Sequence, residues 1–375
     1  MTQIVILGSG FAAIAAIREL RRRKVQADIT VVSPKNELIY LPSLIWLPAG
    51  LRHGQDLRID LAAYFCRQQV KWFQGSVQQV LDGGRRVVTD HGELANDFLI
   101  IATGGRYIRK LPGIEHAIIP CEGIAQAEVI RDRISAMNGG TIAIGFASNP
   151  KEPGAMRGGP MFEFLFGIDT LLRRQQRRDL FKLVFFAPSN KPGQRLGESA
   201  VERILEHMDR CGIETHLGHK PVRFEPSKVV TEGGEFDADL ILFMPGLTGP
   251  AWLDQCELPR SEGGFIQGDA NCRVPGLQRV YVAGDIGSFP GPDWMAKQAH
   301  QADLQAVAAA RNIAAVLRGD PESHEFCTEL ACIIDGLDSG MLVYRRGKRR
   351  LIVPRMAPLH WAKRWFEAAY LRSLR

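Results

Sequence analysis

Seven cysteines give this chain thiols, the side chains best suited to redox and nucleophilic chemistry. They are spread over 375 residues, at Cys66, Cys121, Cys211, Cys256, Cys272, Cys327 and Cys332. An odd number and wide spacing in a long chain do not fit a secreted disulfide scaffold. The spacing of the last two fits no common zinc pattern, so no metal site is expected. The cysteines are therefore either redox-active or small buried hydrophobic side chains.

A second group of residues suits phosphate binding. Gly8-Ser9-Gly10-Phe11-Ala12-Ala13 matches the motif G-x-G-x-x-A. Gly8 permits a tight turn, Gly10 lets the backbone approach a pyrophosphate, and Ala13 allows a helix to pack closely on a strand. The flanking pattern predicts a strand, a helix and a second strand, at residues 4–7, 14–23 and 27–32. A β-α-β unit that carries this motif predicts a dinucleotide site at the helix amino terminus.

The end of the second predicted strand departs from the usual pattern. Such units place Asp or Glu there to bind a ribose hydroxyl, whereas this chain reads Val31-Val32-Ser33-Pro34. Ser33 can hydrogen-bond a ribose without a charge. The motif alone therefore leaves the identity of the dinucleotide open.

Three later segments complete the frame. Apolar strands at residues 97–103 and 239–244 each run into a turn of small residues, Gly104-Gly105 and Pro245-Gly246, and Val280–Ala283 delivers Gly284-Asp285. This order resembles the FAD-dependent pyridine nucleotide–disulfide oxidoreductase superfamily over residues 4–313. The resemblance implies FAD as cofactor, with Asp285 at its ribityl chain. It also implies an α/β fold of two Rossmann-like domains, each built of three layers, two of β-sheet and one of α-helices (ββα).

The resemblance implies the following division and cofactor contacts. The FAD domain is discontinuous, at 1–110 and 237–313, around a second Rossmann-like domain at 111–236, and residues 314–375 form a carboxyl-terminal region with an amphipathic helix. The residues expected to contact FAD are Gly8, Gly10, Phe11, Ala12, Ala13, Ser33, Pro34, Pro42, Val77, Ala102, Thr103, Gly104, Gly284, Asp285, Lys297 and Gln298.

The second domain lacks a complete phosphate-binding motif. Its first strand ends at Gly145 and continues Phe146-Ala147-Ser148-Asn149-Pro150. Ala147 would crowd a pyrophosphate, and Pro150 removes an N–H donor from the expected start of the helix. We therefore expect this domain to fold without binding a nicotinamide nucleotide.

Three stretches resemble the sulfide:quinone oxidoreductase and flavocytochrome c sulfide dehydrogenase branch. They lie at residues 40–46, 154–164 and 294–299. In that branch Pro42 would touch the isoalloxazine ring, Lys297 would stabilise the negative charge of reduced flavin, and Gln298 would hydrogen-bond the ring or a quinone. Lys297 and Gln298 are expected to open the helix that follows Asp285.

The branch uses three cysteines, and this chain matches two of them. Cys121 corresponds to the first and Cys332 to the last, but no cysteine occurs near Met156 to Gly158, where the middle one belongs. Two alternatives follow. Either Cys121 and Cys332 form the redox pair, or Cys332 acts alone by holding a persulfide or a charge-transfer thiolate. Cys66, Cys211, Cys256 and Cys272 are expected to be plain buried side chains.

The carboxyl-terminal tail carries the surplus of positive charge. The net charge is +6, and residues 345–375 contain ten Lys or Arg and one acid, Glu367. The helix predicted at 359–371 places Leu359, Phe366 and Tyr370 on one face, with Trp361 and Trp365 to the side. Aromatic side chains mixed with Lys and Arg are typical of a helix lying in an anionic lipid surface. The alternatives are a helix that docks on the FAD domain or forms a homodimer.

These features predict a peripheral membrane flavoenzyme. No apolar run is long enough for a membrane helix, no signal peptide is expected, and no nucleic-acid motif accompanies the basic tail. The leading hypothesis is electron transfer from sulfide or another small sulfur species to a membrane quinone. The alternatives are an NADH:quinone reductase of the type II class, which the broken second motif opposes, and a catalytically degenerate FAD-bound interaction protein.

Overall fold

The first domain is built on a parallel sheet that the amino-terminal motif opens. The computed structural model describes residues 1–375 and places five strands in the order β21-β9-β1-β2-β5. Their bounds are β1 (Gln3–Leu7), β2 (Asp28–Ser33), β5 (Val70–Gln74), β9 (Phe98–Ile101) and β21 (Val280–Val282). The predicted β-α-β unit is confirmed, and its helix α1 (Phe11–Arg22) starts within the motif, directly after Gly10 and three residues earlier than predicted.

Alternation along β1 explains the layers on either side of this sheet. Ile4 and Ile6 pack with α1 and the helix α7 (Ala299–Arg318), whereas Val5 and Leu7 pack toward an antiparallel sheet. That sheet consists of β6 (Val77–Leu81), β7 (Arg86–Thr89) and β8 (Gly92–Ala95). Side chains of a strand point alternately to its two faces. Both faces of β1 are buried, so Ile4 to Leu7 are all apolar.

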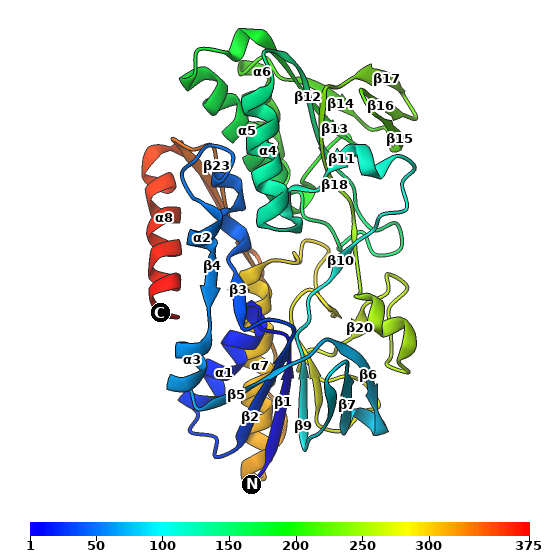
Figure 1. The fold of residues 1–375 in the computed structure, drawn as a ribbon, viewed down its shortest axis with the longest axis vertical. Coiled ribbons are helices and arrows are strands. Elements are labelled where there is room, and N and C mark those ends of the chain that lie inside the picture. The colour runs from blue at the N-terminus through cyan, green and yellow to red at the C-terminus, as the bar shows by residue number, and fades with distance from the viewer.

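The second domain repeats this plan above the first, as Figure 1 shows. Its parallel sheet has the order β11-β18-β12-β13-β14. A second antiparallel sheet, β15-β16-β17, lies in the chain between β14 and β18. The bounds are β11 (Ala117–Ile118), β12 (Gly140–Phe146), β13 (Phe181–Ala187), β14 (Glu214–Leu217), β15 (Pro221–Glu225), β16 (Lys228–Thr231), β17 (Gly234–Asp237) and β18 (Leu240–Met244). The helices are α4 (Ile124–Ala136), α5 (Gly159–Arg174) and α6 (Glu198–Arg210).

One expected domain boundary is wrong. The sequence placed residues 239–244 at the return to the FAD domain, because they resemble the strand at 97–103. The strand β18 instead pairs with β12 and β11 and so belongs to the second sheet. Each sheet receives its own strand of this design, β9 in the first and β18 in the second, and the chain returns to the first domain only after Met244.

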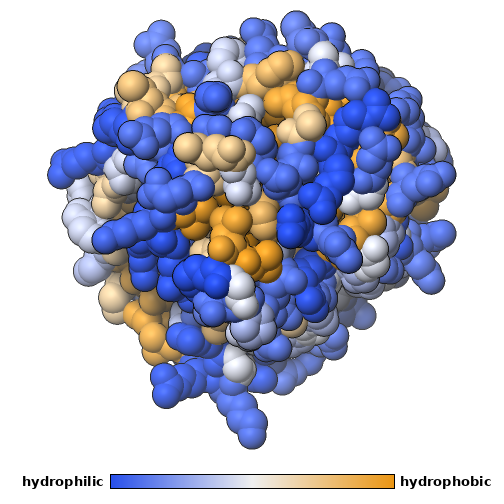
Figure 2. Space-filling view, turned by 90° about the horizontal axis from the view of Figure 1, so that it is seen from below, coloured by the Kyte–Doolittle hydropathy of each residue, from blue (hydrophilic) through white to orange (hydrophobic).

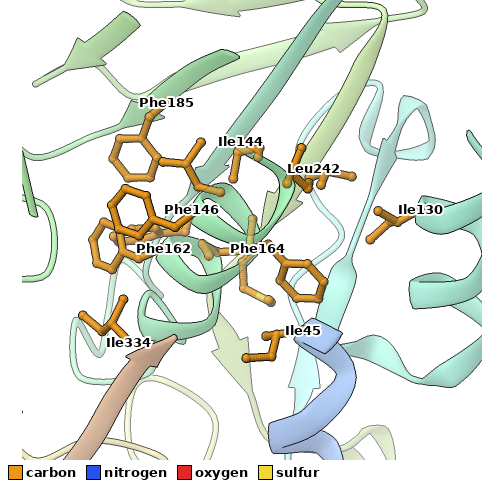
Figure 3. Packing of buried hydrophobic residues seen from close by; sticks show 14 of the residues in the cluster. Ile45, Ile130, Ile144, Phe146, Phe162, Phe164, Phe185, Leu242 and Ile334 are labelled. Carbon is orange, nitrogen blue, oxygen red and sulfur yellow. The ribbon is translucent and has the colours of Figure 1, made fainter. Parts of the chain in front are cut away.

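The carboxyl-terminal region ties the two domains together. It consists of a meander of β23 (Glu329–Asp335), β24 (Gly340–Arg346) and β25 (Arg349–Met356), followed by the helix α8 (Ala357–Arg372). Figure 3 shows Ile334 of β23 and Ile45, from the 3-10 helix Leu41–Trp46, packed with Phe162 and Phe164 of α5 in the core of the second domain. One apolar cluster therefore includes residues from both ends of the chain and from its middle.

Several short elements complete the fold. They are α2 (Gly54–Leu57), α3 (Ala62–Arg67), β3 (Glu37–Ile39), β4 (Arg58–Asp60), β10 (Arg106–Tyr107), β19 (Leu247–Thr248), β20 (Ile266–Gln267) and β22 (Gly287–Ser288). The lower end of the molecule presents mainly hydrophilic residues with smaller hydrophobic patches between them (Figure 2). No helix combines the length and the apolar character needed to cross a membrane.

The helix α8 turns polar side chains inward and aromatic ones outward. It runs along the outer edge of the molecule, in red in Figure 1. His360 and Glu367 are buried, whereas Trp361, Trp365 and Phe366 are 61%, 73% and 60% exposed. Phe366 nevertheless lines the same cavity as Tyr370, which also packs against Phe11, as the expected grouping of these two side chains on one face implies. The inward side of the helix is therefore mixed, because Leu371 is buried there as well.

Candidate functional site

A cavity of about 1750 Å³ lies where the strands of both sheets end. Its wall includes the residues that follow β1, β2, β5, β9 and β21, and also those that follow β12 and β13. Ligands of open α/β sheets bind at the carboxyl ends of the strands. The volume exceeds that of an ordinary small-molecule pocket, which is about 300–1000 Å³, so the cavity has room for a dinucleotide and a further reactant.

The glycine motif has the geometry that a pyrophosphate needs. Gly8 has a φ of +103°, and a Cβ there would lie 2.5 Å from the carbonyl oxygen of Ala102. A Cβ at Gly10 would meet no atom within 4 Å, so the backbone is open to the cavity. Backbone N–H groups at the start of α1 then face the cavity with the positive end of the helix dipole. The residues present fit a bound dinucleotide.

All residues expected at the cofactor line this cavity except Ala13. Ala13 is fully buried between α1 and the sheet, as its packing role requires. Ser33 does reach the cavity, but its hydroxyl donates to the Lys35 carbonyl at 2.8 Å and accepts from Trp72 Nε1 at 3.0 Å. The Ser33 hydroxyl therefore has its hydrogen engaged within the protein and keeps one lone pair with which it can accept from a ribose hydroxyl.

Asp285 has a partner that the sequence did not indicate. It lies in the turn after β21 and forms an ion pair with Arg157, which also donates to the Tyr107 hydroxyl. Burial opposes the charge on Arg157, but Asp285 outweighs it and raises the pKa of the guanidinium. Arg157 belongs to the stretch in which the middle cysteine was expected, so this wall of the cavity carries a cation rather than a thiol.

Lys297 is half-buried and lies outside the helix in which the sequence placed it. The helix α7 begins at Ala299 and is preceded by Gln298, so Lys297 lies in the loop before it. Its ammonium donates to the carbonyls of Asp285 at 3.1 Å and Gly287 at 2.6 Å and lies 3.8 Å from the centre of the Phe265 ring. Burial lowers its pKa to about 8, and a cation held here can face negative charge in the cavity.

The two cysteines singled out from the sequence both line the cavity. Cys332 lies on β23 and Cys121 in the 3-10 helix Pro120–Glu122, and both thiols are free. Burial raises the pKa of each to about 12. Both therefore remain protonated at neutral pH unless a neighbouring group accepts the proton.

A buried ion pair lies within electrostatic reach of both thiols. Lys363 of α8 donates to Glu163 of α5, and the backbone N–H of Asp335 donates to the same carboxylate at 2.9 Å. Burial raises the pKa of Glu163, although Lys363 opposes the shift. His360 and Trp46 hold Asp335 at 2.7 Å and 3.2 Å, which fixes α8 against the cavity wall. Glu163 interrupts the apolar run 161–166, which is a sign in the sequence that could have indicated this pair.

Gly159, next to the stretch in which the middle cysteine was expected, lies close to Cys332. A Cβ placed on Gly159, the first residue of α5, would lie 3.6 Å from the Cys332 sulfur. The Gly159→Cys variant is therefore expected to form a disulfide with Cys332 when oxidised. Thiol titration under denaturing conditions should then count one free thiol fewer than in the parent protein. The control Gly154→Cys lies on the same stretch and should count one more, and an equal gain in Gly159→Cys would contradict the geometry.

The second phosphate-binding turn is replaced by a long loop. β12 ends at Phe146 and α5 begins only at Gly159, so residues 147–158 separate strand and helix. In the first domain only residues 8–10 separate β1 from α1. The expected helix start near Pro150 is wrong by several residues. A strand and helix joined in this way do not form the tight glycine turn that brings a helix amino terminus onto a pyrophosphate.

The end of the cavity beneath α8 is aromatic and carries an unpaired acid. Tyr40, Tyr370 and Phe366 line it, together with Asp303 of α7. Neither Oδ1 of Asp303 nor the Tyr370 hydroxyl has a hydrogen-bond partner within the protein. Burial raises the pKa of Asp303 from 3.8 to about 7, although Arg18 opposes the shift.

This shift predicts a pH effect on stability. Folding favours protonated Asp303, so its contribution is fully present below pH 3.8 and is lost as the pH rises through about 7. The Asp303→Asn variant should therefore lose less stability than the parent between pH 4 and 7, in melting temperatures measured across that range. The exposed Asp293→Asn change is the control and should leave the profile as it is. Parallel profiles for Asp303→Asn and the parent would contradict the shift.

Comparisons with known proteins agree with this architecture. The family model described as pyridine nucleotide-disulphide oxidoreductase matches residues 2–311. The sulfide-quinone reductase of Aquifex aeolicus is 23% identical over 99% of this chain and 91% of the relative. The solved structure of the sulfide:quinone oxidoreductase from that organism has a TM-score of 0.87 at 19% identity, covering 100% of this chain and 92% of the other. A type II NADH:quinone oxidoreductase of Staphylococcus haemolyticus is 27% identical over 76% of this chain and 75% of its own.

The matched family spans both parallel sheets, including the glycine motif and the acid after β21. Its members bind FAD, and the cavity at the strand ends has the open backbone that this dinucleotide needs. The chain belongs to the pyridine nucleotide-disulphide oxidoreductase family of FAD-dependent flavoproteins.

Proposed function

We propose that this oxidoreductase takes electrons from sulfide or a related small sulfur compound and delivers them to a membrane quinone. FAD, when bound, supplies the chemistry of accepting and releasing an electron pair. The observation that carries the proposal is the placement of Cys332. Its thiol lies on the cavity wall within electrostatic reach of the buried pair Glu163–Lys363.

The Glu163–Lys363 pair provides the Cys332 thiol with a proton acceptor and a positive charge. A thiol whose pKa is raised to about 12 reacts slowly at neutral pH, because the nucleophile is the thiolate. Glu163 can accept its proton, and the Lys363 ammonium can stabilise the negative charge that remains. Cys121 lies within reach of the same pair, so a mechanism with both cysteines and one with Cys332 alone use the same groups.

The helix α8 supports a lipid-soluble acceptor. Phe366, Glu367 and Tyr370 line the cavity, while Trp361 and Trp365 on the same helix face outward. Exposed aromatic side chains near Lys and Arg are typical of a helix lying in the headgroup region. We infer that the protein binds the membrane surface through α8 and that the quinone enters beneath this helix.

The second candidate donor is NADH, since type II NADH:quinone oxidoreductases are among the relatives. The loop at residues 147–158 opposes it, because the backbone there does not form a phosphate cradle. The test is anaerobic flavin absorbance of the purified holoprotein, mixed separately with sulfide and with NADH. Bleaching by sulfide alone supports the proposal. Bleaching by NADH alone overturns it in favour of the second donor, and no bleaching with either favours a degenerate flavoprotein.

A further inference from the structure

Two arginines on the cavity wall have no carboxylate partner. Arg345 of β24 is buried, and its guanidinium lies 4.8 Å from the centre of the Trp294 ring. One of its nitrogens donates to the main-chain carbonyl of Arg195, but Nε has no partner within the protein. Arg195 itself, in the segment after β13, donates to the Pro153 carbonyl at 2.7 Å. Neither arginine forms a salt bridge.

Three acids of the same cavity are already engaged. Asp285 is paired with Arg157, and Glu163 with Lys363. Glu152 accepts from the Ser261 hydroxyl at 2.6 Å. None of these acids contacts Arg195 or Arg345 as a salt-bridge partner, so the positive charge beside Trp294 is uncompensated.

A positive charge without a counter-charge on the cavity wall points to an anionic ligand. Burial lowers the pKa of Arg195 to about 10 and also lowers that of Arg345, yet guanidinium groups stay charged at neutral pH. Burying a positive charge without a counter-charge is costly, so such a group is expected to be paired with an anion. Guanidinium is the side chain best matched to a carboxylate or another planar oxyanion.

The strand register of the carboxyl-terminal meander shows how Arg345 lies relative to the Cys332 thiol. Leu330 pairs with Arg345, and Cys332 pairs with Val343, two residues further along the same strands. Paired residues of an antiparallel ladder share a face, so Cys332 and Arg345 project to the same side, about 7 Å apart along the strands. A small molecule can therefore contact both.

We propose that Arg195 and Arg345, beside Trp294, form an oxyanion subsite for a small anionic sulfur compound. This proposal rests on the proposed function for the sulfur and names the class of reactant at that site. The molecule carries sulfonate, thiosulfonate or carboxylate oxygens, which the two guanidinium groups bind, and it presents its sulfur toward Cys332.

Thiosulfate binding to the FAD-loaded protein tests the subsite. Because Arg345 lies over Trp294, binding is expected to change tryptophan fluorescence, and calorimetry at constant ionic strength gives an independent affinity. Arg345→Gln and Arg195→Gln should each weaken binding by about tenfold or more, the range for a hydrogen bond to a charged group. Arg349→Gln, an exposed change on the same meander, should bind as the parent does. Unchanged affinity in both cavity variants, or no saturable binding by the parent, overturns the subsite.

Two further measurements complete the test. The first distinguishes a sulfur compound from a nucleotide phosphate as the ligand, and the second distinguishes failure of the subsite from failure of the proposed sulfide reaction. A nucleotide phosphate could offer the same oxygens, so NADPH is titrated under the same conditions. Tight NADPH binding that depends on Arg345 and excludes thiosulfate overturns a sulfur-compound subsite. If sulfide fails to bleach the flavin while thiosulfate binding still depends on Arg345, the oxyanion subsite stands and the proposed sulfide reaction falls.

Discussion

Replacing Cys332 with Ala is expected to slow the reduction of the bound flavin by sulfide by at least about a thousandfold, the scale on which loss of a nucleophile acts. Cys332 is a free thiol on the cavity wall, within electrostatic reach of Glu163 and Lys363. Without it, sulfide has no thiol in this position with which to form a sulfur–sulfur bond, a two-electron oxidation whose electrons the bound FAD would accept. The measurement is the anaerobic stopped-flow rate of absorbance loss at saturating sulfide.

The controls distinguish a chemical role from a structural one. Cys327→Ala changes a thiol just before the same strand, outside the cavity lining, and should react as the parent does. Cys121→Ala separates the two mechanisms. A loss comparable to that of Cys332→Ala supports a redox pair, whereas a retained rate supports Cys332 acting alone. An unchanged rate in Cys332→Ala would remove the role assigned to this residue.

Changing Trp361, Trp365 and Phe366 together to Ser is expected to weaken binding to anionic vesicles by about a hundredfold or more. These three side chains are among the most exposed large apolar groups of the chain. Removing about 1 kcal/mol of apolar transfer free energy at each position gives this change in partition. Vesicle sedimentation measures it, and quinone reduction in vesicles should fall while flavin reduction by sulfide in solution stays the same.

Surface substitution is a sharper test than removing the tail. Deleting residues 356–375 would also leave Glu163 and Asp335 without their partners Lys363 and His360, which lie on α8. An unpaired buried charge is strongly destabilising, so a deletion would mix folding with membrane binding. Leu180→Ser, an exposed apolar change in the second domain, is the matched control. Full vesicle binding by the triple variant would show that α8 is not the anchor.

The α/β fold, the FAD-binding family and the cofactor were predictable from the sequence because each depends on local constraints. Gly8 must adopt a positive φ beside Ala102, and Gly10 must leave the backbone open. Both requirements restrict residue type at fixed spacing after a strand. The alternation of Ile4 and Ile6 with Val5 and Leu7 likewise follows from a strand buried on both faces.

Other features could not be read from local pattern. The strand at residues 240–244 resembles that at 98–101 because both are buried parallel strands before a turn of small residues. Which sheet each one joins depends on its hydrogen-bonded neighbours, which a single strand does not encode. The break between Phe146 and α5 was visible as a lost motif, but the length of the loop was not.

The sequence by itself determined the family, the dinucleotide motif, the missing middle cysteine and the aromatic basic tail. Only the tertiary structure paired Arg157 with Asp285 across 128 residues and Lys363 with Glu163 across 200. It alone placed Gly159 beside Cys332 and left Arg345 without a counter-charge. Electrostatic partners are set by distance in space and by burial, whereas sequence spacing restricts only the backbone and the nearest turns.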